Sequence, residues 1–138
     1  MITISPIENV DEELFANISD AAREELGNFP LSGFSFMQER WVMKDSTGQA
    51  ILFVFIYAPC IVLEYSEMWM IPTKRFQAFH VSDCKSYAPL VQKHYPNLRI
   101  AIRKGFERER KLARHLGYST AYGEEDRDGK IVTLYGAD

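Results

Sequence analysis

The chain contains little cysteine and no long hydrophobic run. Two cysteines among 138 residues cannot build a disulfide framework, so we expect reduced thiols and a cytoplasmic protein. The longest apolar candidate, residues 50–63, is shorter than the ~20 residues that a membrane-spanning helix needs, and it contains Pro59. The first residues carry neither the basic nor the apolar segment of a secretory signal, and we expect no such signal.

The composition gives no sign of disorder, repeats or a linker. Hydrophobic residues make up 46% of the chain, charged residues 25% and aromatic residues 13%, which is ordinary for a folded globular domain. A chain of this length has enough apolar mass for one core of moderate size and little room for a second. We therefore expect residues 1–138 to form a single domain.

Acidic and basic residues are unevenly distributed, although the net charge is only −3. Residues 1–30 hold seven acidic residues against one basic residue, and residues 98–115 hold seven basic residues against two acidic ones. One acidic face and one basic face are therefore expected. The basic stretch fits phosphates or an acidic partner, and it equally fits a helix face that is only solvated. The pI of about 5.6 argues against a dedicated nucleic-acid-binding protein.

Apolar residues recur with strand and helix periods in the first half of the chain. Residues 2–5 alternate as a strand does, and an apolar stripe over residues 10–26 predicts one amphipathic helix, begun by Asn9 and ended by Gly27. Residues 31–38 fit either a loop or a short helix. Three strands and one turn are expected next, the strands at residues 40–44, 50–57 and 61–71 and the turn at 45–48.

Helices and strands alternate in the second half. Residues 72–95 predict a helix, with a kink or a break at Pro89. Residues 98–103 alternate as a half-buried strand, which must return parallel to the strand before that helix. A charged helix over residues 106–116 precedes two last strands, at 118–122 and 130–135, joined by an acidic connection at 124–129. The order β-α-β-β-β-α-β-α-β-β predicts an α/β fold with a mixed sheet of six or seven strands flanked by helices.

This order, in a chain of this length, resembles the GNAT superfamily of acyl-CoA N-acyltransferases, and the resemblance covers residues 40–135. Leu116, Gly117 and Tyr118 resemble the Leu-Gly-Phe sequence that closes the fourth GNAT helix. Three stretches are also similar to the small GNAT-like proteins of podophages, which are internal or assembly proteins: residues 68–73, 94–98 and 114–118. The resemblance implies a GNAT fold, acetyl-CoA as a ligand, and a place in the bacterial host cytoplasm or the virion.

A GNAT enzyme holds the pyrophosphate of acetyl-CoA with backbone N–H groups at a helix N-terminus. The family sequence there is Arg/Gln-x-x-Gly-x-Gly/Ala, and the corresponding residues 72–78 of this chain contain no glycine. Because Cβ atoms obstruct a tight phosphate nest, we expect a degenerate loop that binds acetyl-CoA weakly or not at all. The resemblance places Lys74, Arg75 and Phe76 in this cofactor-binding stretch. The two cations could meet phosphates through their side chains, or they are only solvated.

Two positions of the fourth GNAT helix depart from the family. The asparagine expected eleven residues before Gly117 is Phe106, and the tyrosine general acid expected four residues before it is Ala113. Tyr118 and Tyr122 are nearby phenols that could replace this acid, and both also fit a packing role.

The candidate general base is Glu64 or Glu67, on the predicted strand at residues 61–71, where this family often keeps a carboxylate. A carboxylate needs a raised pKa to act as a base. The two residues are three apart, so a regular strand directs them to opposite faces and at most one faces a cleft. An exposed or paired glutamate is the alternative for either residue.

Two function classes follow from these residues. The first is an acyl-CoA-dependent N-acyltransferase, and the second is a non-catalytic interaction or virion-assembly module that keeps the GNAT fold. An acidic protein partner or self-association through residues 103–114 would suit the second class. His80 and Cys84 lie four residues apart, as metal ligands can, but the sequence offers no second pair, so no metal site is expected.

Overall fold

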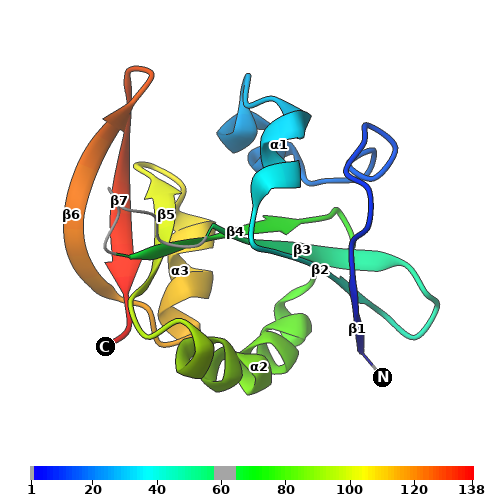
Figure 1. Ribbon diagram of the computed structural model, residues 1–138. Coiled ribbons are helices and arrows are strands. Elements are labelled where there is room, and N and C mark those ends of the chain that lie inside the picture. The colour runs from blue at the N-terminus through cyan, green and yellow to red at the C-terminus, as the bar shows by residue number, and fades with distance from the viewer. Residues whose placement is uncertain (1, 58–64) are drawn as a thin grey trace. The chain divides into compact units, whose positions relative to one another are not determined.

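The computed structural model describes residues 2–57 and 65–138, which form one mixed seven-stranded sheet with flanking helices (Figure 1). The strands are β1 (Thr3–Pro6), β2 (Glu39–Lys44), β3 (Ala50–Tyr57), β4 (Ser66–Pro72), β5 (Leu98–Arg103), β6 (Thr120–Arg127) and β7 (Lys130–Gly136). The helices are α1 (Asp20–Leu26), α2 (Val81–His94) and α3 (Glu107–His115), and the 3₁₀ helices are η1 (Leu31–Phe36) and η2 (Ala78–His80). The described residues fall into two compact units, residues 2–57 with 69–76 and residues 65–68 with 77–138.

The strand order is β1-β2-β3-β4-β5-β7-β6. β1 pairs antiparallel with β2, and β2 with β3; β7 pairs antiparallel with both β5 and β6. β4 and β5 run parallel, with Ser66, Glu67 and Met68 facing Leu98, Arg99 and Ile100. The predicted mixed sheet and the predicted parallel return after a helical crossover are therefore confirmed.

The core of the first unit is built from aromatic rings. Phe15, Phe34, Phe53 and Phe55 are at most 3% exposed, and their ring centroids lie 4.5 to 6.0 Å apart in mostly edge-on contacts. Trp69, from the middle of β4, packs against the same cluster. In Figure 1, α1 lies over the strands of this unit.

The predicted helix over residues 10–26 is wrong in its first half. Residues 12–17 form turns, and α1 begins only at Asp20, with Ser19 as the N-cap that accepts a hydrogen bond from the Ala22 N–H at 3.1 Å. The helix cannot begin earlier, because Ile18 forms a β-bridge with Thr73 and the next residue, Ser19, has an extended backbone. Phe15 and Ile18 still enter the core, so the apolar period predicted burial correctly but not the local conformation.

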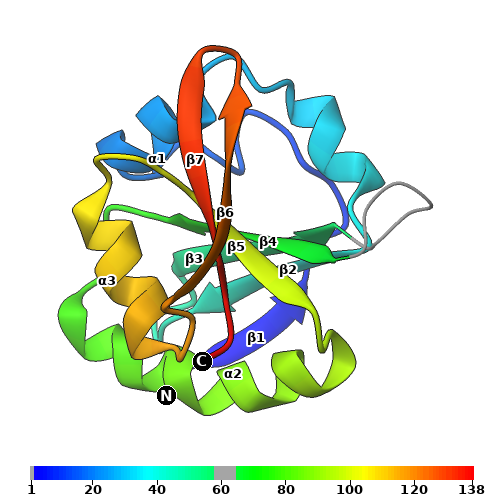
Figure 2. The ribbon, with the colours of Figure 1, turned by 90° about the vertical axis from the view of Figure 1, so that its left-hand side faces the viewer.

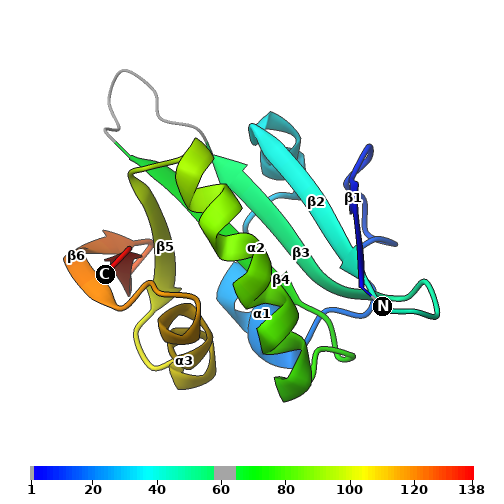
Figure 3. The same cartoon turned by 90° about the horizontal axis from the view of Figure 1, so that it is seen from below.

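The second unit joins β5, β7 and β6 to α2 and α3. Leu98, Ile100 and Ile102 of β5 are buried, as their alternation predicted. α3 buries Leu112 and Ala113, and Gly117 follows it with φ +92°, which confirms the predicted helix stop. α2 and α3 lie side by side, as seen from below in Figure 3. No helix of the described residues is long and apolar enough to span a membrane.

Two further boundaries differ from the sequence-based expectation. Helix does not begin at residue 72, because β4 extends to Pro72 and a turn precedes η2. α2 continues as one helix through Pro89, so the predicted break is wrong and the alternative, a kink, stays a prediction. Residues 124–127 are not a connection but the last part of β6. The hairpin of β6 and β7, which faces the viewer in Figure 2, closes over Asp128 and Gly129. Both have positive φ, as a two-residue hairpin turn requires.

Candidate active site

The segment between β4 and η2 is the predicted cofactor-binding loop, and its first backbone donors are occupied. The Thr73 N–H donates to the Ile51 carbonyl at 3.0 Å, and the Lys74 N–H donates to the Asn17 carbonyl at 2.9 Å. The Thr73 hydroxyl donates to the Ala50 carbonyl at 2.8 Å. The start of the loop is therefore tied to β3 and to the segment before α1.

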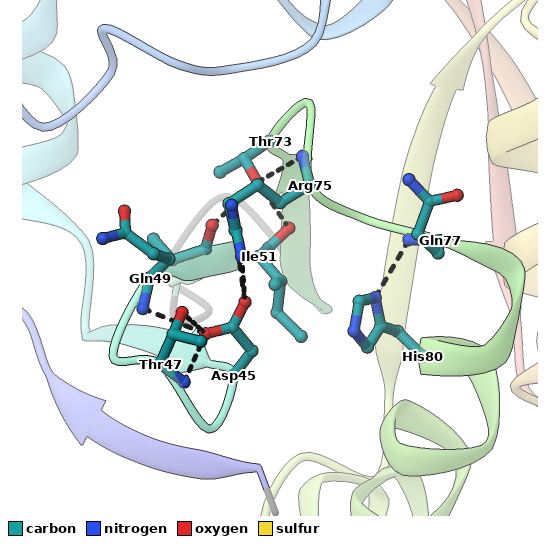
Figure 4. Close-up of polar contacts among 9 residues, drawn as sticks. Asp45, Thr47, Gln49, Ile51, Thr73, Arg75, Gln77 and His80 are labelled. Carbon is teal, nitrogen blue, oxygen red and sulfur yellow. Dashed lines mark hydrogen bonds and ion pairs between the residues drawn. The ribbon is translucent and has the colours of Figure 1, made fainter.

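The next three N–H groups of the loop are also used within the chain, and Figure 4 shows the contacts of Arg75 and Gln77. The Arg75 N–H donates to Thr73 Oγ1 at 3.2 Å, and the Phe76 N–H donates to the Thr73 carbonyl at 3.1 Å. The Gln77 N–H donates to His80 Nδ1 at 2.9 Å. A phosphate nest needs consecutive N–H groups that point together at one anion. Five consecutive N–H groups, from residue 73 to residue 77, have acceptors in the protein instead.

The Arg75 guanidinium is held by a carboxylate. Its Nε and Nη2 donate to Asp45 Oδ2 at 3.1 and 2.9 Å. Asp45 Oδ1 also accepts from the Thr47 hydroxyl at 2.5 Å and from the N–H groups of Thr47 and Gln49. The Thr47 hydroxyl and then Arg75 hold the pKa of Asp45 well below its usual value. Arg75 therefore completes the turn between β2 and β3, and it would have to leave Asp45 to meet a phosphate.

The other two residues of the predicted cofactor-binding set lie in different environments. The Lys74 side chain is exposed, and it makes no ion pair with any described residue. Phe76 is 8% exposed and belongs to the interior. Lys74 is thus the cation of this loop that can turn toward an anion without breaking an existing ion pair.

Glu67, one of the two predicted bases, lies on β4 inside a network of charged groups. It is 7% exposed, and Arg127 donates to both of its oxygens, from Nη1 at 2.9 Å and from Nη2 at 2.6 Å. Arg127 also donates from Nε and Nη2 to Glu125 Oε2, at 3.1 and 2.9 Å. The Tyr65 hydroxyl donates to the other oxygen of Glu125 at 3.0 Å. Two carboxylates therefore flank one guanidinium, and the Tyr65 phenol joins the network through Glu125.

The charges of this network stabilise one another. The pKa of Arg127 is raised, mainly by its hydrogen bonds to Glu67, and the pKa of Glu125 is lowered, mainly by its hydrogen bonds to Arg127. Burial and the neighbouring Glu125 raise the pKa of Tyr65. At neutral pH the network therefore holds an ionised arginine beside a protonated phenol.

Tyr118, the predicted general acid, is buried at 3% exposure behind the end of α3. Its hydroxyl donates to Gln92 Oε1 of α2 at 2.6 Å. Burial raises the pKa of Tyr118, so the phenol is protonated at neutral pH. Tyr122, the other phenol that the sequence offered, is 54% exposed and stacks under the Arg99 guanidinium at 3.8 Å.

Side chains at the two positions where the sequence departs from the GNAT pattern supply no polar group. Ala113 is fully buried in α3. Phe106 precedes that helix as its N-cap residue, where the side chain makes no capping hydrogen bond, and the Arg103 guanidinium lies 5.3 Å from its ring. Phe106 and Ala113 carry neither the amide of the family's asparagine nor the phenol of its tyrosine, so they cannot take over the roles of those residues.

Several predicted features lie outside the site or outside the described residues. Glu64 and Cys60 belong to residues 58–64, which the structure does not describe. His80 and Cys84 are both buried, and burial raises the pKa of the Cys84 thiol to about 11. Within residues 2–57 and 65–138, no three His, Cys, Asp or Glu side chains gather as metal ligands do.

The sequence interpretation missed Arg127, Glu125 and Tyr65. Residues 124–129 were expected to be an acidic connection. The spacing of residues in an irregular connection does not predict which side chains share a face, as it does in a strand. Within β6, Glu125 and Arg127 are two residues apart and therefore point to the same face. A lone arginine between acids, at strand spacing, was the signal that could have found the network.

No protein-family model matches this chain, and no curated protein does. Solved structures do match it over nearly its whole length. A spermidine N-acetyltransferase chimera from Vibrio cholerae and hSSAT has a TM-score of 0.69 and 13% identity, over 97% of this chain and 93% of its own. A GNAT-family acetyltransferase from Streptococcus agalactiae has a TM-score of 0.66 and 12% identity, over 97% and 93%.

A third solved structure contains the ligand that the resemblance implies. This GNAT-family acetyltransferase from Elizabethkingia anophelis, with acetyl-CoA bound, has a TM-score of 0.64 and 15% identity, over 97% of this chain and 95% of its own. The similarities show that the chain has the GNAT fold, as the order of its elements predicted. Identities this low show the fold alone, because one fold hosts many functions.

Proposed function

We propose that this chain is a phage GNAT-like protein that resembles an acyl-CoA-dependent N-acyltransferase but has a degenerate loop for the CoA pyrophosphate. The hydrogen bonding of residues 73–77 carries the proposal, because it occupies the donors that a phosphate nest would use. A pyrophosphate at this loop is left with the Lys74 side chain, which is exposed and makes no ion pair with any described residue. Acetyl-CoA then binds with a Kd above about 100 μM.

The chemistry of acyl transfer assigns a role to two side chains. The acceptor nitrogen attacks the thioester carbonyl, the C–S bond breaks, one proton leaves the nitrogen and one proton joins the departing thiolate. In this proposal Glu67 takes the first proton and Tyr118, whose raised pKa keeps it protonated, supplies the second. Because Arg127 donates to both oxygens of Glu67, it must release one of them before Glu67 can act. Glu64 stays the other predicted base.

A second candidate function is a non-catalytic interaction or virion-assembly module. Three observations favour it: Glu67 is fully engaged by Arg127, Tyr118 is buried against Gln92, and Ala113 stands at the position of the family's general acid. The phage assignment, in either candidate, is supported by the similarity of residues 68–73, 94–98 and 114–118 to podophage proteins.

Calorimetric titration with two thioesters tests the proposed loop. Acetyl-CoA carries the pyrophosphate and acetyl-pantetheine lacks it, while both present the same acyl thioester. We expect the two to bind with Kd values within about threefold of each other, because the protein gains little from the pyrophosphate. Acetyl-CoA binding in the low micromolar range, about a hundredfold tighter than acetyl-pantetheine, would show a working phosphate site and overturn the proposal.

Release of free CoA thiol in the presence of simple amines separates the two candidate functions. An active enzyme releases thiol, and Glu67→Gln then abolishes the release while leaving the affinity for acetyl-pantetheine unchanged. A chain that releases no thiol with any amine at millimolar acetyl-CoA supports the non-catalytic candidate.

A further inference from the structure

The solvent face of α3 is a basic surface. Arg108, Arg110, Lys111 and Arg114 are all exposed, and at 3.6 residues per turn they span an arc of about 160° in which the exposed Glu107 is the one acidic residue. These four residues are called the basic face below. The opposite side of the helix carries the buried Leu112 and Ala113, which attach α3 to its unit. The fold therefore uses one side of α3 and leaves the basic face to solvent.

The basic face does not serve the stability of its own helix. Among the described residues, Arg108, Lys111 and Arg114 make no ion pair. Arg110 pairs with Glu107 at 3.1 Å, but both side chains are more than half exposed, and such a pair contributes under ~1 kcal/mol. Arg108 lies in the first turn, where the helix dipole disfavours a positive charge. A basic residue at this position is better explained by a partner than by the helix.

An acidic segment of comparable size lies in the other unit. Glu8, Asp11, Glu12 and Glu13 are exposed, and the carboxylates of residues 8–13 make no ion pair with any described residue. Asp11 accepts a hydrogen bond from the Leu14 N–H at 2.9 Å, which fixes the turn that follows. The acidic segment, residues 8–13, is therefore an ordered turn that presents four carboxylates to solvent.

We propose that the chain associates with a second copy of itself, with the acidic segment of one copy docked on the basic face of the next. Four carboxylates then meet four cations, and both groups come from the same chain in equal number. Such a contact is heterologous, because it joins two different surfaces. Each pair leaves one acidic segment and one basic face unoccupied, so the assembly grows with concentration or closes into a ring. This inference does not depend on the proposed function.

Charge complementarity alone gives orientation and a fast on-rate more than it gives affinity. Surface charges are screened over about 8 Å at physiological ionic strength. The association is therefore weak and salt-sensitive, and we expect its dissociation constant to be about 0.1 to 1 mM.

Sedimentation equilibrium with two charge-reversal variants tests the contact. The first variant, Arg110→Glu with Arg114→Glu, keeps the acidic segment but loses the basic face. The second, Glu12→Lys with Glu13→Lys, keeps the basic face but loses the acidic segment. We expect the wild-type mass to rise with concentration at about 20 mM salt and the association to weaken at least tenfold at about 300 mM. Each variant alone is monomeric, and an equimolar mixture of the two associates again.

A matched control is the α2 variant Lys85→Glu with Lys93→Glu, which changes the net charge equally on exposed residues outside the basic face. It is expected to associate as the wild type does. Circular dichroism shows whether each variant is folded; if Glu at residue 114 disturbs the end of α3, Arg108→Gln with Lys111→Gln replaces the first variant. A wild-type chain that stays monomeric at 1 mM and low salt, or a mixture that stays monomeric, would overturn the proposal.

Discussion

At the scale of single residues, the interaction of Glu67 with Arg127 is the strongest polar feature of the candidate site. A carboxylate that is 7% exposed has lost most of its hydration, and the two hydrogen bonds from Arg127 replace it. The same bonds that make Glu67 tolerable in the folded chain occupy both of its oxygens. Stability and base catalysis therefore make opposite demands on Arg127.

A double-mutant cycle measures how much this pair contributes. Arg127→Met leaves Glu67 buried without its guanidinium, and we expect the free energy of unfolding to fall by roughly 2 kcal/mol. Glu67→Gln with Arg127→Met removes the unpaired charge as well, and it should cost about 1 kcal/mol less than the two single changes added together. Urea denaturation provides the four free energies.

The matched control for this cycle is Arg110→Met, which breaks the exposed pair with Glu107 and should cost less than ~0.5 kcal/mol. Strict additivity of the Glu67 and Arg127 changes would mean that the two side chains do not stabilise each other.

At the scale of elements, β5 and the first half of α1 show what sequence periodicity can predict. The alternation of Leu98, Ile100 and Ile102 predicted both the strand and its buried face, because burial and conformation follow the same period in a strand. The apolar stripe over residues 10–26 predicted burial but not conformation. Thr73, more than fifty residues later, pairs with Ile18 and holds it extended, and no local pattern contains that information.

The candidate site was predictable to a similar extent. Both Glu67 and the glycine-free loop were identified from the resemblance. Glu67 lies where the family often has a carboxylate, and the loop lacks the glycines of the family sequence. The partner of Glu67 was not, since Arg127 lies 60 residues away and on a strand that was expected to be a connection. The occupied N–H groups of residues 73 and 74 depend on acceptors at Ile51 and Asn17, which only the fold brings to the loop.

The turn between β2 and β3 gives a prediction about acid stability. The pKa of Asp45 in the folded chain lies below its ordinary value of 3.8, so its contribution to stability is complete above about pH 4 and is lost as the pH falls toward the folded pKa. We expect Asp45→Asn to flatten the dependence of the unfolding free energy on pH between about pH 4 and pH 2. Chemical denaturation at a series of pH values measures this slope.

Two variants of the partners of Asp45 sharpen that test. The Thr47 hydroxyl lowers the pKa of Asp45 more than Arg75 does, so Thr47→Ala should flatten the slope more than Arg75→Gln. A residual slope is expected in every variant, because the pKa values of Glu125 and Asp138 are also lowered. An Asp45→Asn chain with the wild-type slope would show that this turn does not contribute to acid unfolding.

At the scale of the whole molecule, the chain keeps the GNAT fold although its candidate functional groups serve internal contacts. The N–H groups of residues 73–77 and the carboxylate of Glu67 have partners inside the protein, and Ala113 is buried. The parallel pairing of β4 and β5 and the crossover through α2 depend mainly on apolar burial. Fold and ligand affinity are thus set by different residues. A change in the loop can weaken a ligand without weakening the sheet.

Ligand-linked stability tests this separation on the intact chain. A ligand that binds only the folded state raises the unfolding free energy by RT ln(1 + [L]/Kd). With 1 mM acetyl-CoA and a Kd above about 100 μM, the increase stays below about 1.4 kcal/mol, whereas a Kd of 1 μM gives about 4.1 kcal/mol. We expect the smaller value in urea denaturation, and a nearly unchanged value in Lys74→Gln, because the exposed cation of the loop contributes at most about threefold to the affinity. Inorganic pyrophosphate at the same concentration should give no increase. A stabilisation near 4 kcal/mol would mean that the N–H groups of residues 73–77 exchange their internal acceptors for the ligand.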